Sequence, residues 1–263
     1  MPTFLDQVIE RTRTDVDARA RAVPIEALEA RIEPRRSRPF SEALIAEGIS
    51  LIAEMKRASP SKGPIRPDAT VSDIVRAYEA GGASACSVLT EGAWFGGSLD
   101  DLIEARAACD LPLLRKDFIV TKYQIVEARA AGADAVLLIV AAVSPDRLVE
   151  LQEIAAAAGL DCLVEVHDED EMEIAIEAGA EIIGVNNRNL HTLEVDPETT
   201  LRLLPDAPAG TIVVAESGIT SRADVERLEV AGVDAILVGE MLMRSDDTGE
   251  AVRALLGSAR SSD

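Results

Sequence analysis

A repeated helix–glycine–strand pattern limits what this 263-residue chain can fold into more than any other feature. In each repeat a helical stretch ends at glycine, which suits the left-handed backbone at a helix C-terminus, and a short apolar run follows. Such an unbroken apolar run is typical of a strand that is buried on both faces. The repeats span residues 78–91, 128–140, 175–187 and 228–240.

Extending this alternation along the chain predicts eight strands, each followed by a helix. The strands are expected near residues 50–56, 85–89, 112–116, 135–140, 161–166, 181–186, 211–215 and 235–238. The helices are expected near residues 71–81, 98–108, 121–131, 144–158, 168–178, 197–204, 221–231 and 247–256. Several helices begin with a side-chain N-cap, namely Ser98, Thr121, Ser144 and Ser221.

This order of elements predicts an α/β fold, a (β/α)8 barrel. The rival fold, an open doubly wound sheet, would carry a G-x-G-x-x-G turn after its first strand, and the sequence has none there. Residues 1–40 are predicted to be an N-terminal helical extension packed on the barrel, and residues 41–263 the barrel itself, in a single domain. An amphipathic helix ending near Pro24, a second short helix and a connector at 33–40 make up the extension, which we expect to act as a lid on one barrel end.

The formal net charge of −21 argues against nucleic acids and anionic membranes as partners. It also indicates adaptation to high salt, because the Debye length of about 3 Å in molar salt weakens repulsion between carboxylates; undiminished stability in dilute buffer would contradict this hypothesis. The longest apolar run, residues 135–143, is too short to cross a bilayer, and the charged N-terminus is unlike a signal peptide. The sequence is compatible with a monomer or a weak homo-oligomer.

The cysteines indicate the redox environment. Cys86, Cys109 and Cys162 are odd in number and form no C-x-x-C pair, so reduced, mostly buried thiols and a cytoplasmic location are expected. His167 and His191 fit no zinc motif, so we expect surface or loop roles for them and no metal site.

Polar residues gather at the predicted carboxyl ends of the strands, where barrels of this kind carry their active sites. Glu54 and Lys56 are two residues apart, so both should face the barrel axis. Glu165 lies between Val164 and Val166, which should face the helices. A single such charge could be a buried ion pair that merely fills the barrel. The convergence of several predicts function, because burying charge is costly unless it is used.

Two further patterns indicate what the site binds. Gly218 and Gly239 follow the last two predicted strands, where barrels often bind phosphate through the backbone, and Ser217 adds a hydroxyl. The loop aromatics Phe95 and Phe118 follow neighbouring strands and predict a pocket for a flat ring, and Trp94 lies beside Phe95. A phosphorylated ligand that carries a flat ring is therefore expected.

Lysine is scarce in this chain, so its positions are informative. Arginine holds its proton too tightly to exchange it, whereas the pKa of lysine shifts readily on burial. Lys56 and Lys116 fit a role in proton exchange. For Lys62 and Lys122 two readings stay open, attraction of an anion or a plain surface charge.

Five stretches resemble the indole-3-glycerol phosphate synthase family: "IAEMKRASPSKG", "LPLLRKDFIVTKYQIVEARAAGADAVLLI", "LVEVH", "IGVNNRNL" and "VAESGI". The resemblance runs from about residue 4 to residue 256. It implies a barrel with an N-terminal helical extension and an enzyme that uses no cofactor and no metal. The implied activity is that of a carboxy-lyase of tryptophan biosynthesis, which converts 1-(2-carboxyphenylamino)-1-deoxyribulose 5-phosphate into indole-3-glycerol phosphate, CO2 and water.

The resemblance also implies a role for individual residues. Lys116 would be the general acid that protonates the substrate's ketone oxygen, and Glu165 the acid/base of the dehydration. Lys56 would bind the substrate's carboxylate, while Glu54 and Asn186 orient the lysine and the substrate's hydroxyls. The implied substrate-binding residues are Ser59, Pro60, Phe95, Phe118, Leu138, Arg188, Leu190, Glu216, Ser217, Gly218 and Gly239.

One position departs from some relatives, which carry a small hydroxyl residue able to bind phosphate where this chain has Glu240. The phosphate anchor is therefore assigned to the backbone near Gly239. Two alternatives stay open, phosphoribosylanthranilate isomerase and a non-catalytic phosphosugar-binding barrel. The E-x-K-x-x-S-P-S-x-G stretch disfavours the first, and the intact set of ionisable groups disfavours the second.

Overall fold

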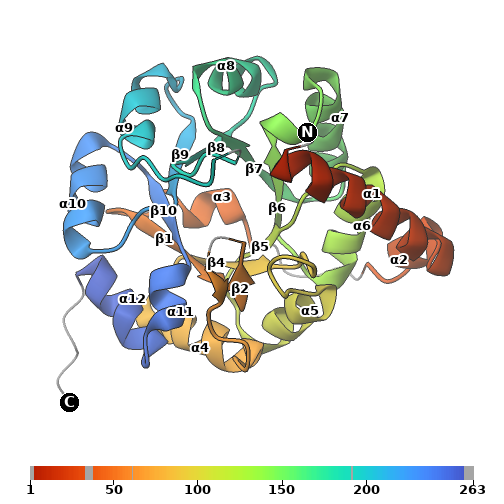
Figure 1. The fold of residues 1–263 in the computed structure, drawn as a ribbon, viewed down its shortest axis with the longest axis horizontal. Helices are drawn as coiled ribbons and strands as arrows, with labels where there is room; N and C mark the ends of the chain where they lie inside the picture. The colour runs from red at the N-terminus through yellow and green to blue at the C-terminus, as the bar shows by residue number, and fades with distance from the viewer. Residues whose placement is uncertain (1–2, 33–37, 61, 191, 258–263) are drawn as a thin grey trace.

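The computed structural model describes residues 3–32, 38–60, 62–190 and 192–257, which form a closed barrel of eight parallel strands ringed by helices (Figure 1). The barrel strands are β1 (Ser50–Met55), β4 (Ala85–Leu89), β5 (Leu113–Lys116), β6 (Ala135–Ile139), β7 (Asp161–Val166), β8 (Ile182–Asn186), β9 (Ile212–Glu216) and β10 (Ala235–Val238). They pair in chain order, and β10 closes on β1. The predicted fold class is confirmed, and every predicted strand lies within one residue of the observed bounds.

The helices that follow the strands also match the sequence pattern. They are α4 (Val71–Gly81), α5 (Leu99–Ala108), α6 (Lys122–Ala131), α7 (Pro145–Ala157), α8 (Glu169–Glu177), α9 (Thr199–Leu203), α10 (Arg222–Ala231) and α12 (Thr248–Leu256). The predicted N-caps are confirmed, since Ser98, Thr121, Ser144 and Ser221 each accept a hydrogen bond from a backbone N–H in the first turn.

Short elements were not predicted. They are the hairpin of β2 (Ala58–Ser59) and β3 (Gly63–Pro64), the 3₁₀ turns η1 (Val140–Ala142) and η2 (Leu204–Asp206), and the helix α11 (Glu240–Arg244). Each is too short to show a hydrophobic period in the sequence.

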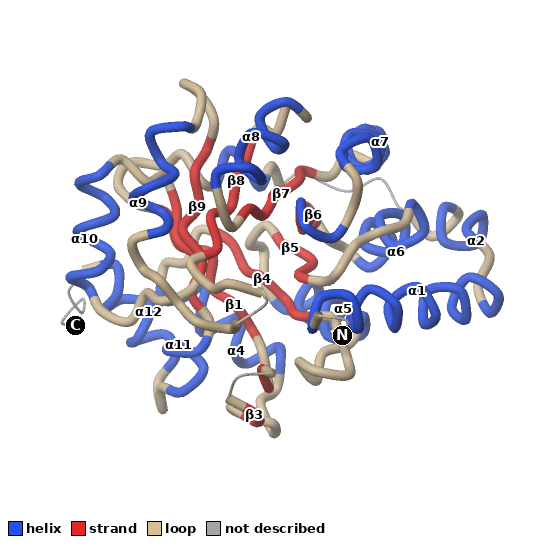
Figure 2. Tube along the Cα trace, turned by 45° about the horizontal axis from the view of Figure 1, so that its top comes forward, coloured by secondary structure: helices blue, strands red, loops and turns tan. Residues whose placement is uncertain are grey.

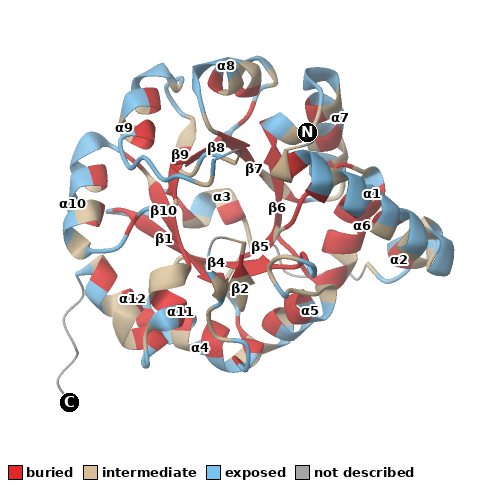
Figure 3. Ribbon diagram, in the orientation of Figure 1, coloured by how far each residue is buried: buried red, intermediate tan, exposed pale blue. Residues whose placement is uncertain are grey.

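Strand side chains alternate between two apolar cores. Val164 and Val166 point outward and pack with the helices, as predicted, while Leu163 points into the barrel. The barrel strands are mostly buried and the helices expose mainly their outer faces (Figure 3). Polar residues on the inner face can therefore meet only at an end of the barrel.

The N-terminal segments α1 (Phe4–Ala22) and α2 (Ile25–Glu29) lie mainly along the side of the barrel, next to α6 (Figures 1 and 2). Val16 and Leu28 pack on α6, and the ring of Phe4 contacts Trp94 with a centroid distance of 5.8 Å. The expected lid is thus reduced to the first two turns of α1, where Leu5 and Val8 pack with the inner core. Residues 33–37 of the predicted connector lie outside the described residues.

The opposite end of the barrel is filled by α3 (Phe40–Ala43). Phe40 and Leu44 are fully buried in the inner core, and the backbone N–H of Ser41 donates to Asp161 Oδ2 at 2.8 Å. The site must therefore lie at the other end.

No helix within the described ranges is both long and apolar enough to cross a membrane. The thiols of Cys86, Cys109 and Cys162 are free, and the first two are buried.

Candidate active site

A cavity of about 530 Å³ opens at the carboxyl ends of the strands. Its lining includes the predicted site residues Glu54, Lys56, Ser59, Pro60, Phe95, Lys116, Phe118, Glu165, Asn186, Arg188, Leu190, Glu216, Ser217, Gly218 and Gly239. These side chains therefore lie in one place, at the carboxyl ends of the strands, although they come from seven different strands or the loops that follow them.

Leu138 is the exception, and its predicted place in the ring pocket is wrong. It points outward and is fully buried in the core between strands and helices. Its neighbours Leu137 and Ile139 point inward and line the cavity instead. Strand alternation explains the difference, because adjacent residues must face opposite sides of the sheet.

Lys116, the last residue of β5, is the centre of the polar cluster. Its Nζ donates to Glu165 Oε2 at 2.9 Å and to Glu216 Oε2 at 2.6 Å. An ammonium has three N–H donors. Among the described residues two of them are used, so one donor is left for a ligand oxygen.

The surroundings hold Lys116 and Glu165 as ions. Burial lowers the pKa of Lys116, but the carboxylates of Glu165, Glu216 and Glu54 outweigh it and raise the pKa above its usual value. Burial raises the pKa of Glu165, but Lys116 and His167 outweigh it and hold the pKa well below the usual range. In the resting site Lys116 is therefore protonated and Glu165 ionised, which are the charge states of a proton donor and a proton acceptor.

Glu216 titrates differently from Glu165, although both contact the same ammonium. Burial raises the pKa of Glu216 to about 7, against the opposing pull of Lys116. Its Oε1 is buried and finds no hydrogen-bond partner in the part of the chain that the structure describes. A group of this kind is neutral below about pH 7 and can then donate a hydrogen bond to a ligand hydroxyl.

The second lysine of the cavity sits in a similar arrangement. Lys56 Nζ lies 2.7 Å from Glu54 Oε1. Asn186 Nδ2 donates to Glu165 Oε1 at 3.0 Å, and Asn186 Oδ1 accepts from the backbone N–H of Arg188 at 3.0 Å. Asn186 thus fixes both the orientation of Glu165 and the start of the loop that carries Arg188.

The prediction that His167 has a surface or loop role is wrong about the surface, because its side chain is buried. The side chain follows β7 and is only 9% exposed, with Nε2 3.2 Å from Glu165 Oε1 and Nδ1 2.8 Å from Glu171 Oε2. Burial lowers the pKa of His167, but the neighbouring carboxylates of Glu165 and Glu171 outweigh it and raise the pKa to about 10. His167 is therefore a cation behind Glu165. His191 lies outside the described residues.

Two glycines make room for the buried carboxylates, and Gly184 was not recognised from the sequence. A Cβ on Gly184 would overlap Glu216 Oε1, and a Cβ on Gly239 would overlap Glu54 Oε1. Gly184 lies in the interior of β8. Here the missing side chain is itself part of the site, because the carboxylate of Glu216 occupies its space.

We expect Gly184→Ala to lower kcat/KM by about tenfold or more, because Glu216 must move off Lys116 to admit the methyl group. Steady-state rates in a double-mutant cycle with Glu216→Ala provide the control. In the Glu216→Ala background the added methyl group has space, so it should cost little. An equal cost in both backgrounds would contradict this explanation.

The cavity wall beyond β9 and β10 has the features of an anion site. Ser217 has a left-handed backbone (φ 63°), as does Gly218 (φ 80°), and strained non-glycine residues of this kind cluster at active sites and ligand clamps. Asn187 Nδ2 donates a hydrogen bond to the carbonyl oxygen of Ser217 at 2.9 Å. Across the mouth, Ser59 Oγ is buried and has no partner within the described ranges. These groups are available to a ligand oxygen.

The opposite wall is apolar. The rings of Phe95 and Phe118 lie 6.4 Å apart at a tilt of 42°. Pro60 and Leu190 complete this wall, and Phe4 from the N-terminal helix also lines the cavity. The cavity therefore has an apolar side, a cationic centre and an anion-binding end, which matches a ring joined to a sugar phosphate. Metal-binding groups of three or more acidic, His or Cys side chains do not occur among the described residues.

Comparison with known proteins identifies close relatives. The sequence profile of the indole-3-glycerol phosphate synthase family matches residues 5–255. Indole-3-glycerol phosphate synthase 2 of Streptomyces coelicolor is 53% identical over 221 residues, covering 84% of this chain and 86% of the relative. The synthase of Burkholderia vietnamiensis is 49% identical over 256 residues, covering 96% and 98%.

Solved structures share the fold at much lower identity. A mutant tryptophan synthase α-subunit from Pyrococcus furiosus superposes with a TM-score of 0.61 at 17% identity, covering 79% of this chain and 98% of that one. Thiamine phosphate pyrophosphorylase from the same organism gives 0.60 at 21%, covering 79% and 93%. At this identity the likeness supports the barrel fold alone.

Proposed function

The chain belongs to the indole-3-glycerol phosphate synthase family of tryptophan biosynthesis, and we propose that it is a carbon–carbon lyase acting on 1-(2-carboxyphenylamino)-1-deoxyribulose 5-phosphate. The observation that carries the proposal is the position of Lys116, an ammonium with one unused donor among the described contacts, between an aromatic wall and an anion-binding end of one cavity.

Each group of the substrate finds a complementary part of the cavity. The phosphate would bind at the end formed by Ser59, Ser217, Gly218 and Gly239. The ring would lie against Pro60, Phe95, Phe118 and Leu190, and Leu137 and Ile139 take the place proposed for Leu138. Lys56 and Arg188 are the cations available to the ring's carboxylate, and Glu216 would hold a sugar hydroxyl.

The first step forms a carbon–carbon bond. The ring carbon that bears the carboxylate attacks the ketone carbon, and Lys116 gives a proton to the ketone oxygen as negative charge develops there. The bond to the carboxylate then breaks, CO2 leaves, and its electron pair restores the aromatic ring. This cleavage is the reason for the lyase class.

The later steps remove water. The hydroxyl made in the first step leaves with a proton, and a proton is lost from the neighbouring carbon to form the indole double bond. Glu165 is ionised in the resting site and bonded to Lys116 and Asn186, so it is placed to accept a proton and return it. Lys56, which also lines the cavity, is the other candidate for this role.

The alternatives have less support. Phosphoribosylanthranilate isomerase and a non-catalytic binding barrel are not favoured by a family match over residues 5–255. A binder would also gain little from burying a lysine between two glutamates, because such clusters are costly to desolvate.

The direct test is the reaction itself. Purified protein is mixed with the substrate in molar KCl, since the net charge of −21 leads us to propose salt adaptation. We expect indole fluorescence to rise and one CO2 to be released per indole formed. Folded protein that produces neither would contradict the proposed function.

A further inference from the structure

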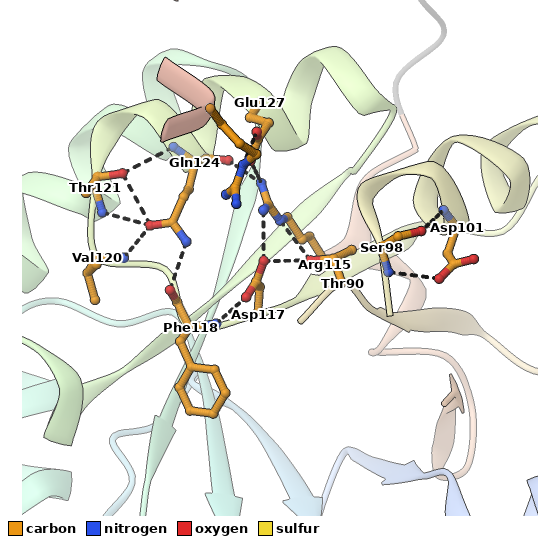
Figure 4. Close-up of polar contacts among 11 residues, drawn as sticks. Thr90, Ser98, Asp101, Arg115, Asp117, Phe118, Val120, Thr121, Gln124 and Glu127 are labelled. Atoms are coloured by element: carbon orange, nitrogen blue, oxygen red, sulfur yellow. Dashed lines mark hydrogen bonds and ion pairs between the residues drawn. The ribbon is translucent and has the colours of Figure 1, made fainter. Parts of the chain in front are cut away.

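Arg115 precedes Lys116 on β5, and its side chain points the opposite way, toward helix α6. It is 1% exposed and makes four contacts. Nε donates to Thr90 Oγ1 at 3.1 Å, Nη1 to the Gln124 carbonyl at 2.8 Å, and Nη2 to Asp117 Oδ2 at 2.8 Å, while Nη1 lies 2.9 Å from Glu127 Oε2 (Figure 4). Apolar residues fill such sites at lower cost, so stability alone does not explain a buried guanidinium here.

The turn after β5, residues 117–121, is fixed by side chains of this same cluster. Asp117 Oδ1 accepts the N–H of Phe118 at 2.9 Å, and Gln124 Nε2 donates to the Phe118 carbonyl at 2.8 Å. Gln124 Oε1 also accepts the N–H groups of Val120 and Thr121 at 3.0 and 3.2 Å (Figure 4). Both polar groups of the Phe118 backbone are thus held, and the position of its ring in the cavity follows from them.

Thr90 joins this turn to the neighbouring loop after β4. Its Oγ1 donates to Asp117 Oδ2 at 2.7 Å while accepting from Arg115, and its N–H donates to the Lys116 carbonyl at 3.1 Å. Its hydroxyl therefore ties the end of one strand to the side chains that flank Lys116 on the next.

The next residue, Glu91, fixes the loop after β4 in turn. Its carboxylate accepts the backbone N–H groups of Ala93 and Trp94 at 2.8 Å each, and that of Phe95 at 3.1 Å. Thr90 and Glu91 together connect the Phe95 loop to the Phe118 turn. The Phe118 turn is consequently held by buried hydrogen bonds and the Phe95 loop by half-buried ones, and the Thr90–Glu91 backbone connects the two sets.

We propose that Thr90, Arg115, Asp117 and Gln124 are positioning residues that hold the rings of Phe95 and Phe118 at a fixed place relative to the Lys116 ammonium. The inference rests on the proposed function, in which the rings bind the aromatic part of the substrate and Lys116 protonates its ketone. It assigns the Thr90 hydroxyl a part in catalysis although Thr90 does not touch the cavity.

The test compares Thr90→Val, which keeps the shape and removes the hydroxyl, with Thr90→Ser, which keeps the hydroxyl. We expect Thr90→Val to lower kcat/KM by roughly 10- to 100-fold, because small displacements of positioned groups have effects of this size. Thr90→Ser should stay within about threefold of the wild type, since a serine makes the same two hydrogen bonds.

A binding measurement separates a loss of ring positioning from a loss of structure that affects the whole site. The probe is the substrate analogue whose ketone is reduced to an alcohol, and inorganic phosphate is the control ligand. Thr90→Val should weaken binding of the analogue roughly tenfold and leave phosphate binding unchanged, since only the ring end is disturbed. Gln124→Glu, which loses the donor to the Phe118 carbonyl, should show the same pattern. It is the substitute variant if Thr90→Val does not fold.

The outcomes are distinguishable. Wild-type turnover in both Thr90 variants, equal losses in both, or an equal loss of phosphate binding would overturn the proposal while leaving the proposed function intact. A wild-type enzyme that forms no indole would instead overturn the proposed function. The analogue and phosphate affinities would still decide whether the cluster positions the rings.

Discussion

Lys116→Met should bind the substrate and form almost no product, with kcat lowered on the order of 10²- to 10⁴-fold. Methionine fills a similar volume and cannot protonate the ketone oxygen. The measurement is single-turnover indole fluorescence together with the affinity for the reduced substrate analogue. Because the lysine contacts two buried carboxylates, its loss removes the ammonium that lies between Glu165 and Glu216 and leaves His167 as the cation beside Glu165, so the pKa of Glu165 should rise.

The matched control is Lys116→Arg, which keeps the positive charge beside the carboxylates and barely releases a proton. We expect it to be nearly as inactive as the methionine variant. If charge alone were sufficient, the arginine variant would retain most of its turnover. Near-normal turnover in Lys116→Met would mean that another group is the proton donor. Circular dichroism establishes that both variants are folded.

Glu165→Gln should have the second largest effect, again on the order of 10²- to 10⁴-fold in kcat. The amide keeps the size of the side chain and can still meet Asn186, but it cannot accept and return a proton. We also expect an intermediate that has lost CO2 and not yet lost water to accumulate. Rapid quench with detection of released CO2 and of indole would reveal a CO2 burst that precedes the fluorescence.

Glu216→Gln is the comparison for this prediction, because Glu216 contacts the same ammonium at 2.6 Å. Its pKa of about 7 allows the neutral form already, so we expect a loss of roughly tenfold or less, as for one hydrogen bond. Equal losses in the two variants would show that Glu165 has no special part in the dehydration.

The barrel could be predicted closely because its local signals agree with its global fold. Continuous apolar runs and glycine-ended helices set the strand bounds, and the caps at Ser98 and Ser221 set helix starts. The position of α1 could not be predicted in this way. Its periodicity shows that one face is buried, but many helices of a barrel offer an apolar surface, and only packing selects α6.

The candidate site could also be predicted from the sequence only in part. Glu54 and Lys56 were placed by strand alternation, and the same argument would have placed His167 beside Glu165, two residues away. Leu138 was implied by the resemblance, and the sequence offered no check on it, because the run "AVLLIV" is apolar on both faces and its composition cannot tell the inner face from the outer. Gly184 gave a signal that was not used, since an isolated glycine inside an apolar strand run indicates that another group approaches the backbone closely.

Phe40 and Leu44, which fill the amino end of the barrel, also limit where molecules can enter and leave the cavity. In the part of the chain that the structure describes, apolar side chains fill the interior below the cavity, so the proposed active site is closed toward the amino end of the barrel. Substrate entry and the exit of carbon dioxide, water and the bulky anionic product must then all take place at the carboxyl end. Departure of the small molecules past a still-bound sugar phosphate is therefore a constraint that the loops around the mouth have to satisfy in every catalytic cycle.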